Sequence, residues 1–242
     1  MKTDSIVIIP TYNEKENIEN IVRRVFSYEK VFDVLVVDDN SPDGTANIVK
    51  NLQQEFAERL FLLERPGKQG LGVAYIAGFR WCLEHNYDYI FEMDADFSHN
   101  PDDLIRLYEA CTKQGADMSV GSRYITGVNV VNWPMKRVLL SYCASKYVRF
   151  ITRMPLRDAT AGFVCYTSKV LKALDLDAIE FKGYGFQIEM KFKTWYKGFK
   201  IIEVPIIFTD RKEGTSKMSG GIIKEAAIGV IALKIKSIFK KI

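Results

Sequence analysis

Two aspartates with one residue between them follow an apolar segment of this sequence. Residues 89–93 read YIFEM, and Asp94 and Asp96 come after them. At the end of a strand, such a pair can direct both carboxylates towards one point, and hard divalent cations prefer carboxylate oxygens as ligands. Taken alone, an Asp-x-Asp sequence is more often a solvated turn. The pair therefore gains weight only from the residues that accompany it.

Two further polar clusters follow apolar runs in the first half of the chain. Residues 10–14, PTYNE, come after the run at 5–9, and residues 38–41, DDNS, come after the run at 31–37. In open α/β sheets, ligands bind beyond the carboxyl ends of the strands. We therefore expect these two clusters and the aspartate pair to converge on one crevice.

The segments that must position these clusters alternate between two periodicities. Short β-branched runs predict strands at residues 5–9, 31–37, 60–63, 89–93 and 118–121. Between them, apolar residues recur at helical spacing, at Ile18, Ile21, Val22 and Val25 and again across residues 104–108. This alternation is typical of strands joined by crossover helices, and it predicts an α/β fold with a mostly parallel sheet.

The second half of the chain has a different rhythm. A Gly/Asn/Trp loop leads to a basic amphipathic segment at residues 134–151 and then to a short strand at 163–166. No repeat, low-complexity tract or flexible linker marks a boundary, and 242 residues can form one α/β core. We therefore expect a single domain over residues 1–242, with one sheet shared by both halves.

Charge is divided unevenly along the chain. Residues 1–120 carry 12 Lys and Arg against 21 Asp and Glu, whereas residues 121–242 carry 22 against 9. Chance clustering of solvated charges is one interpretation, and an anionic partner for the second half is the other. No nucleic-acid-binding module or aromatic stacking motif is present, so nucleic acid is not the expected partner.

The C-terminal segment, residues 221–242, predicts a basic amphipathic helix. One helical face carries Ile228, Ile231, Ile235, Ile238 and Ile242, and lysines at 234, 236, 240 and 241 occupy the other. Such a helix can lie on an anionic membrane surface, or it can pack its isoleucines on the protein itself or on a membrane-anchoring partner. Because the N-terminus lacks a secretory leader, we expect a cytoplasmic protein, peripheral at the cytoplasmic face of a membrane.

Five motifs, in this order and spacing, resemble the inverting GT-A glycosyltransferases of family two, and within them the dolichol-phosphate mannose synthases. They are VIIPTYNEKENI, VVDDNSPDGT, RPGKQGLGVAYIAGF, MDADFSHNP and GSRY. The resemblance extends over about residues 5–221. It implies a GT-A fold, a Rossmann-like, mostly parallel twisted sheet flanked by helices, followed here by the C-terminal amphipathic helix.

The resemblance implies that residues 1–120 bind a nucleotide sugar and a metal ion. By motif position, the guanosine end of a GDP-sugar would be held by Pro10, Tyr12, Glu14, Val37 and Asp39. From the residues alone, Asp39 could instead cap a loop or a helix.

The MDADFSH motif extends this implied donor site to the metal. Asp94, Ala95 and Asp96 would contact the donor, and Asp94 and Asp96 would bind Mg²⁺ or Mn²⁺. In related synthases a glutamine two residues beyond the second aspartate also binds the metal. Here that position is Ser98, so the third ligand is either Ser98 or a water that it holds.

The acceptor side is implied to lie within residues 121–220. Arg123, Arg137 and Ser141 match positions that receive the acceptor phosphate, and Arg211 and Lys217 match a loop that closes over the donor diphosphate. Catalysis would then rest on electrostatic positioning by Asp96, Arg123, Arg211 and Lys217. Without the resemblance, isolated Arg and Lys residues are usually only solvated.

Asp158, in the DATAGF segment, has two interpretations. This segment and GYGFQIEMKFKTWY, at residues 183–196, resemble the branch of the family that uses lipid phosphates. Asp158 could orient the site or cap a turn.

The reaction implied is inverting transfer of mannose from GDP-mannose to a dolichyl or polyprenyl phosphate, giving polyprenyl phosphate mannose and GDP. A phosphate monoester is largely ionised at neutral pH, so it can attack without a general base. Consistent with this, the chain lacks the QxxRW motif of family-two polymer synthases. The alternatives are the same transfer from UDP-glucose or another nucleotide sugar, and a non-catalytic nucleotide-sugar-binding protein.

Overall fold

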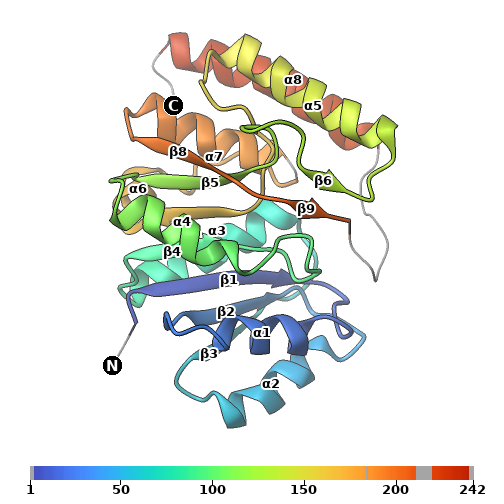
Figure 1. Cartoon of the computed structure of the whole chain (residues 1–242), viewed down its shortest axis with the longest axis vertical. Helices are drawn as coiled ribbons and strands as arrows, with labels where there is room; N and C mark the ends of the chain where they lie inside the picture. The colour runs from blue at the N-terminus through green and yellow to red at the C-terminus, as the bar shows by residue number, and fades with distance from the viewer. Residues whose placement is uncertain (1–2, 184, 211–219, 240–242) are drawn as a thin grey trace.

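The protein is described from a computed structural model that defines residues 3–183, 185–210 and 220–239 (Figure 1). Its strands are β1 (Ser5–Thr11), β2 (Asp33–Asp38), β3 (Leu60–Glu64), β4 (Tyr89–Glu92), β5 (Met118–Ser122), β6 (Val130–Val131), β7 (Val164–Thr167), β8 (Ile201–Pro205) and β9 (Phe208–Thr209). Its helices are α1 (Ile18–Phe26), α2 (Thr45–Glu55), α3 (Leu71–Glu84), α4 (Asp103–Thr112), α5 (Met135–Thr152), α6 (Ser168–Ala173), α7 (Gly185–Tyr196) and α8 (Gly220–Ile238).

Seven of these strands form one sheet in the order β3-β2-β1-β4-β7-β5-β8. All neighbouring pairs are parallel except those of β7, which runs antiparallel to both β4 and β5. The predicted mostly parallel α/β sheet is confirmed, and strands from both halves of the chain belong to it. Because β1, β2, β4 and β5 point the same way, their carboxyl ends lie at one edge of the sheet.

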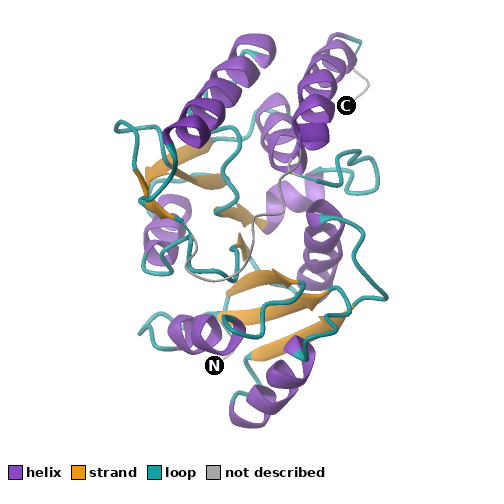
Figure 2. Ribbon diagram, turned by 90° about the vertical axis from the view of Figure 1, so that its right-hand side faces the viewer, coloured by secondary structure: helices purple, strands orange, loops and turns teal. Residues whose placement is uncertain are grey.

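Helices cover both faces of the sheet (Figure 2). On β1, Val7 and Ile9 pack into the core with residues of α1, α2 and α4. The alternating residues Ile6 and Ile8 pack on the other face with residues of α3, α6 and α7. Because both faces are covered, these strands read as continuous apolar runs, which is why the sequence indicates them clearly.

The structure differs from the predicted elements mainly in the second half. The predicted strands of the first half are all present, and the one expected at 31–37 begins at Asp33. Strand β8 and the two-residue strands β6 and β9, which pair with each other, were not predicted. Strands β6 and β9 have two residues each, and the apolar residues of β8 are interrupted by Glu203 and Pro205, so none of the three gives a clear strand signal.

Strand β9 joins the second half of the chain to the loop that follows β4. The backbone N–H of Thr209 donates to the carbonyl of Ser98 at 3.2 Å, and His99 forms an isolated antiparallel bridge with Phe208. The loop that contains the aspartate pair is therefore held against the second half of the chain by backbone contacts.

Helices α5 and α8 pack beside each other at one end of the molecule (Figure 1). Val230 and Leu233 of α8 are buried in a small core with residues of α5 and α7. The isoleucines at 228, 231, 235 and 238 are instead 44–67% exposed. Among the described residues, packing of that isoleucine face on the protein itself is therefore wrong, and the face is open. No helix in the described part of the chain has the length and apolarity needed to cross a bilayer.

Candidate active site

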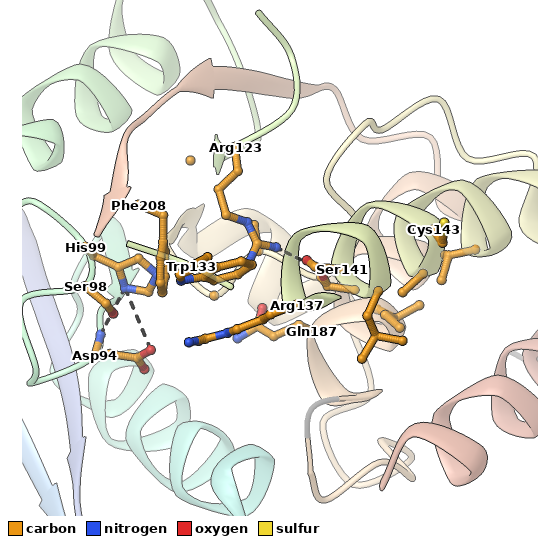
Figure 3. A pocket seen from close by; sticks show the side chains of 18 of the residues that line it. Asp94, Ser98, His99, Arg123, Trp133, Arg137, Ser141, Cys143, Gln187 and Phe208 are labelled. Atoms are coloured by element: carbon orange, nitrogen blue, oxygen red, sulfur yellow. Dashed lines mark hydrogen bonds and ion pairs between the residues drawn. The ribbon is translucent and has the colours of Figure 1, made fainter. Parts of the chain in front are cut away.

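A cavity of about 430 Å³ opens beyond the carboxyl ends of β4 and β5 (Figure 3). One side is formed by Asp94, Ser98 and His99 from the loop after β4. The other side includes Arg123, after β5, and Arg137 and Ser141 of α5. The structure thus brings five of the residues that the sequence singled out, Asp94, Ser98, Arg123, Arg137 and Ser141, to one cavity, whereas the almost buried Asp96 is not part of its wall.

An apolar part of the same cavity lies between three helices. It is lined by Leu140, Cys143, Ala144, Tyr147 and Val148 of α5, Ile188 of α7, and Ala227 and Val230 of α8. The Tyr147 hydroxyl donates to the Ala227 carbonyl at 3.0 Å, which ties the two outer helices together. A polar end and an apolar end in one cavity fit an amphiphilic ligand.

The loop after β4 makes a tight turn that directs oxygen atoms towards the cavity. Phe97 adopts a left-handed φ of 57°, and the backbone N–H of Ser98 donates to Oδ1 of Asp96 at 3.0 Å. Ala95 and Asp96 are almost buried, whereas Asp94 reaches the cavity surface. The buried Ser98 Oγ has no hydrogen-bond partner among the described residues.

These oxygen atoms fit a hard cation that is bound partly by the protein and partly by oxygen atoms of a substrate. No group of three or more His, Cys, Asp or Glu residues suited to a metal occurs in the described part of the chain. Asp94 and Asp96 with the unpartnered hydroxyl of Ser98 supply oxygen ligands, and Mg²⁺ and Mn²⁺ commonly complete their shell with waters and phosphate oxygens.

His99 is a site residue that sequence reasoning missed. Its ring stacks on Phe163 at a centroid distance of 4.9 Å, and its Nδ1 lies 3.3 Å from the backbone N–H of Asp94, which donates to it. Burial lowers its pKa to about 4, so the ring is neutral at pH 7 and supports Asp94 as an acceptor. No His spacing signals this role, but the position of His99 inside the MDADFSH motif does.

Arg123 is held in place by Asp158. Its Nε and Nη2 donate to the two carboxylate oxygens at 2.7 and 2.6 Å, and its backbone N–H donates to Oδ2 at 3.0 Å. Thr160 accepts from Nη2 at 2.8 Å. Asp158 therefore holds Arg123 in place in the cavity wall, and its Oδ1 also accepts from the Thr160 hydroxyl two residues later at 3.3 Å.

Burial and pairing act oppositely on this ion pair. Burial alone would raise the pKa of Asp158 and lower the pKa of Arg123. Mutual charge attraction and hydrogen bonding outweigh burial, so the pKa of Asp158 lies below its ordinary value and that of Arg123 above. Both groups are charged, and Nη1 of Arg123 makes no hydrogen bond to any described residue.

Arg137 reaches the same cavity from the first turn of α5. Its Nη1 donates to Oδ1 of Asp210 at 2.7 Å, and its side chain is 28% exposed. Ser141, one turn later on the helix, also lines the cavity. Arg123, Arg137 and Ser141 thus line one cavity, and their assignment to an acceptor phosphate stays a prediction.

The predicted donor residues lie at the same edge of the sheet. Strand register pairs Pro10 with Val37, and Tyr12 and Glu14 follow in the loop after β1. The side chain of Val37 is buried in the core, so it can meet a ligand only through its backbone. The ammonium group of Lys68 lies 4.9 Å from the Tyr12 ring centroid.

The two aspartates after β2 have different surroundings. Asp38 accepts from the Thr11 hydroxyl and from Ser41, so it fixes the turn. Asp39 instead lies 2.9 Å from Nη1 of Arg65, an ion pair without hydrogen-bond alignment. Burial raises the pKa of Asp39, against the lowering effect of Arg65. Asp39 therefore caps no helix but also accepts a hydrogen bond from the backbone N–H of Gln69 in the loop before α3, and its predicted part in nucleoside binding stays a prediction.

Two predicted catalytic residues cannot be placed. Arg211 and Lys217 lie outside the residues that the structure describes, so their assignment to the donor diphosphate remains a prediction from the sequence.

A buried polar network beneath the cavity was also missed. Lys191 Nζ donates to the Ala161 carbonyl at 2.6 Å and to Gln187 Oε1 at 2.9 Å, and Gln187 Nε2 donates to Glu92 at 2.6 Å. These side chains are almost fully buried. The network links the end of β4 to the 158–163 segment that supports Arg123. Its residues belong to the core although their charged and polar types are typical of the surface.

A mostly parallel sheet whose edge carries an aspartate pair opposite fixed arginines is the arrangement of a nucleotide-sugar glycosyltransferase of the GT-A type. The chain belongs to glycosyl transferase family 2, whose sequence profile matches residues 6–175.

Similar proteins extend this comparison. A polyprenol monophosphomannose synthase of Mycolicibacterium smegmatis is 46% identical over 93% of this chain and 85% of its own length. An undecaprenyl-phosphate mannosyltransferase of Micrococcus luteus is 49% identical over 93% of this chain and 91% of its own. The solved structure of a Pyrobaculum calidifontis mannosyltransferase in complex with GDP-Man and Mn²⁺ superposes with a TM-score of 0.58 at 16% identity, covering 100% of this chain and 72% of that one.

We predict that Asp158→Asn lowers the free energy of unfolding by about 3–5 kcal/mol at pH 7, because it leaves the buried Arg123 without its counter-charge. The folded-state pKa of Asp158 is depressed, so its contribution is present above about pH 4 and is lost as pH falls through the folded value. The difference in the free energy of unfolding between wild type and variant, measured by urea unfolding, should therefore become smaller as the pH is lowered below about 4.

Asp177→Asn is the matched control, because Asp177 is 87% exposed in its ion pair with Arg80. It should change the free energy of unfolding by less than about 1 kcal/mol. An equal effect of the two substitutions would contradict the structural role of Asp158.

Proposed function

We propose that this protein catalyses inverting transfer of mannose from GDP-mannose to a polyprenyl or dolichyl phosphate, giving polyprenyl phosphate mannose and GDP. The observation that carries the proposal is the single cavity that contains Asp94 on one side and Arg123 and Arg137 on the other. Carboxylates can bind a metal ion that in turn binds a diphosphate, and guanidinium groups can bind a second phosphate. Two anionic substrates can then meet there.

The chemistry needs positioning more than proton transfer. An oxygen of the acceptor phosphate attacks the anomeric carbon, a new C–O bond forms, and the bond to the β-phosphate oxygen breaks so that GDP departs. A phosphate monoester, with a second pKa near ~6, is already largely a dianion at neutral pH. The fixed cations Arg123 and Arg137 orient this nucleophile, and no carboxylate base is required.

Asp94 and Asp96, with Ser98 directly or through water, would hold Mg²⁺ or Mn²⁺. The ion would neutralise the charge that develops on the diphosphate leaving group. Pro10, Tyr12, Glu14, Val37 and Asp39 would bind the nucleoside. Under this proposal residues 1–120 serve the donor and residues 121–220 serve the acceptor within one domain.

The relatives support this choice of substrates. Both curated relatives are named for mannose transfer to a polyprenyl phosphate, at 46% and 49% identity. The apolar end of the cavity, between α5, α7 and α8, agrees with an acceptor that carries a hydrocarbon chain.

We predict metal-dependent product formation from GDP-mannose and a polyprenyl phosphate, with much less product from UDP-glucose. Asp96→Ala should lower turnover about a hundredfold or more, because a metal that stabilises leaving-group charge contributes several kcal/mol. Chelation should abolish product, and added Mg²⁺ or Mn²⁺ should restore it. A radiolabelled-mannose transfer assay measures all of these rates.

Asp102→Ala is the control for this substitution, because Asp102 lies just beyond the same loop but faces Arg24 at the surface. Its turnover should match wild type. Undiminished product in Asp96→Ala or in chelator would remove the metal role, and a preference for UDP-glucose would reassign the donor.

We predict that Arg137→Ala raises the KM for the lipid phosphate about tenfold or more and leaves the KM for GDP-mannose unchanged. The reason is the loss of a charge-assisted contact to the acceptor phosphate. Arg149→Ala removes an arginine of the same helix that is exposed outside the cavity, and both KM values should stay at the wild-type level. Equal acceptor KM values in the two variants would disprove the assignment.

We also propose that the protein acts at the cytoplasmic face of a membrane, with the open face of α8 against the lipid. The exposed isoleucines of α8 are accompanied by exposed apolar residues of the neighbouring α5, among them Met135, Leu139 and Phe150. Lysines on both helices can meet anionic headgroups. The apolar end of the cavity lies between these same helices, so a lipid acceptor could enter from the bilayer.

We predict that the protein sediments with vesicles containing phosphatidylglycerol and much less with neutral vesicles, and that salt weakens the binding. The double variant Ile228→Ser, Ile235→Ser should bind at least about tenfold more weakly, because it removes two insertable side chains. Ile207→Ser, at an isoleucine 60% exposed elsewhere, should bind like wild type. Unchanged sedimentation of the double variant would instead favour anchoring by a partner protein.

A further inference from the structure

Trp133 lies at the junction between the two arginines of the cavity. The centre of the Arg137 guanidinium is 4.0 Å from the Trp133 ring centroid, and that of Arg123 is 5.5 Å away. In Figure 3 the indole lies between the two guanidinium groups. One aromatic ring therefore contacts both cations that are proposed to meet the acceptor phosphate.

The backbone fixes this ring from both sides. Trp133 follows Asn132, which has a left-handed φ of 63°. It precedes Pro134, and a proline restricts the backbone of the residue before it, here Trp133, to extended conformations. The ring of Phe208 packs edge-on against the indole at 5.1 Å. Phe208 belongs to β9, so Trp133 is held by the same strand that contacts the loop after β4.

The electrostatic purpose of the ring follows from its neighbours. Two guanidinium groups in one cavity repel each other, and each is neutralised by its own carboxylate, Asp158 for Arg123 and Asp210 for Arg137. The negative face of an indole attracts cations most strongly of the aromatic rings. Trp133 can thus keep both cations in the cavity without adding an anion that would repel a phosphate.

The indole also carries a donor without an acceptor. Nε1 of Trp133 is buried, and it makes no hydrogen bond to any residue that the structure describes. A buried N–H without a partner costs free energy and calls for an explanation. Trp133 lines the cavity, so once the neighbouring side chains that cover Nε1 shift, an anionic ligand there can supply the missing acceptor.

We infer that Trp133 is a binding residue for the acceptor phosphate. Its ring sets the separation of Arg123 and Arg137, and its Nε1–H donates a hydrogen bond to a phosphate oxygen. The inference rests on the proposed function only in taking the acceptor to be a lipid phosphate. Neither the metal nor the sugar donor enters it.

The test is calorimetric titration of the donor-free protein with farnesyl phosphate, and with farnesol to isolate the contribution of the phosphate. Trp133→Phe keeps an aromatic ring but removes the N–H, and it should weaken farnesyl phosphate binding about tenfold. Trp133→Leu removes both functions and should weaken it further. In the transfer assay, both variants should raise the acceptor KM and leave the GDP-mannose KM unchanged.

Trp81→Phe provides the matched control. Trp81 of α3 packs on Phe61 and His85 and is not part of the cavity wall. It should bind farnesyl phosphate like wild type. Circular dichroism and thermal unfolding verify that each variant is folded.

The outcomes separate this inference from the proposed function. The inference is overturned if both Trp133 variants bind farnesyl phosphate with wild-type affinity. It is also overturned if the variants lose affinity for farnesol as much as for farnesyl phosphate, because Trp133 would then provide only apolar contact. Phosphate-dependent binding that weakens in the variants supports the inference even if the wild type transfers no mannose. If the wild-type protein binds farnesol as tightly as farnesyl phosphate, both the inference and the proposed function are contradicted.

Discussion

The buried ion pair between Arg123 and Asp158 is the interaction on which the cavity depends. Burying two charges is expensive, and the cost is offset only where geometry and additional hydrogen bonds are good. Here Glu203 of β8 accepts the backbone N–H groups of Asp158 and Arg157 at 2.9 and 2.8 Å, so the carboxylate is itself held by the sheet. A guanidinium fixed in this way needs no reorganisation when an anion arrives.

The loop after β4, with Asp94 and Asp96, depends on the second half of the chain in the same way. His99 supports the backbone of Asp94, and β9 supports His99 and Ser98. The Lys191 network joins the end of β4 to the segment that carries Asp158. The two halves of the chain are therefore joined by backbone and side-chain contacts around the cavity, although they carry opposite net charge in the sequence.

Much of this frame could be predicted from the sequence. Strands β1, β2 and β4 are apolar runs that end in polar clusters, so both the sheet and the position of Asp94 follow from local pattern. Helix α7 escaped because its buried face includes Glu189 and Lys191, which read as solvated residues. Glu189 pairs with Lys193 one turn later on the same helix, but Lys191 donates to the Ala161 carbonyl, 30 residues away in the chain, and a local pattern cannot reveal that contact.

The same reason limits the prediction of the site. Motif position placed Arg123, Arg137 and Ser141 in one cavity with Asp94, but the partner of Arg123 lies 35 residues away in the chain. The roles of His99 and Trp133 depend on contacts with Phe163, Phe208 and the arginines that no spacing rule describes. Sequence therefore identified the charged groups, and the structure supplied what holds them.

The antiparallel strand β7 has a consequence for the size of the reacting group. It separates β4 from β5 by two strand spacings, roughly 10 Å. Because β7 runs backwards, the loop before it enters at the edge where β4 and β5 end, and it closes the floor between them. Asp94 and Arg123 thus lie on two sides of one cavity with residues 160–162 in its wall, so a sugar-sized group fits between the two charges.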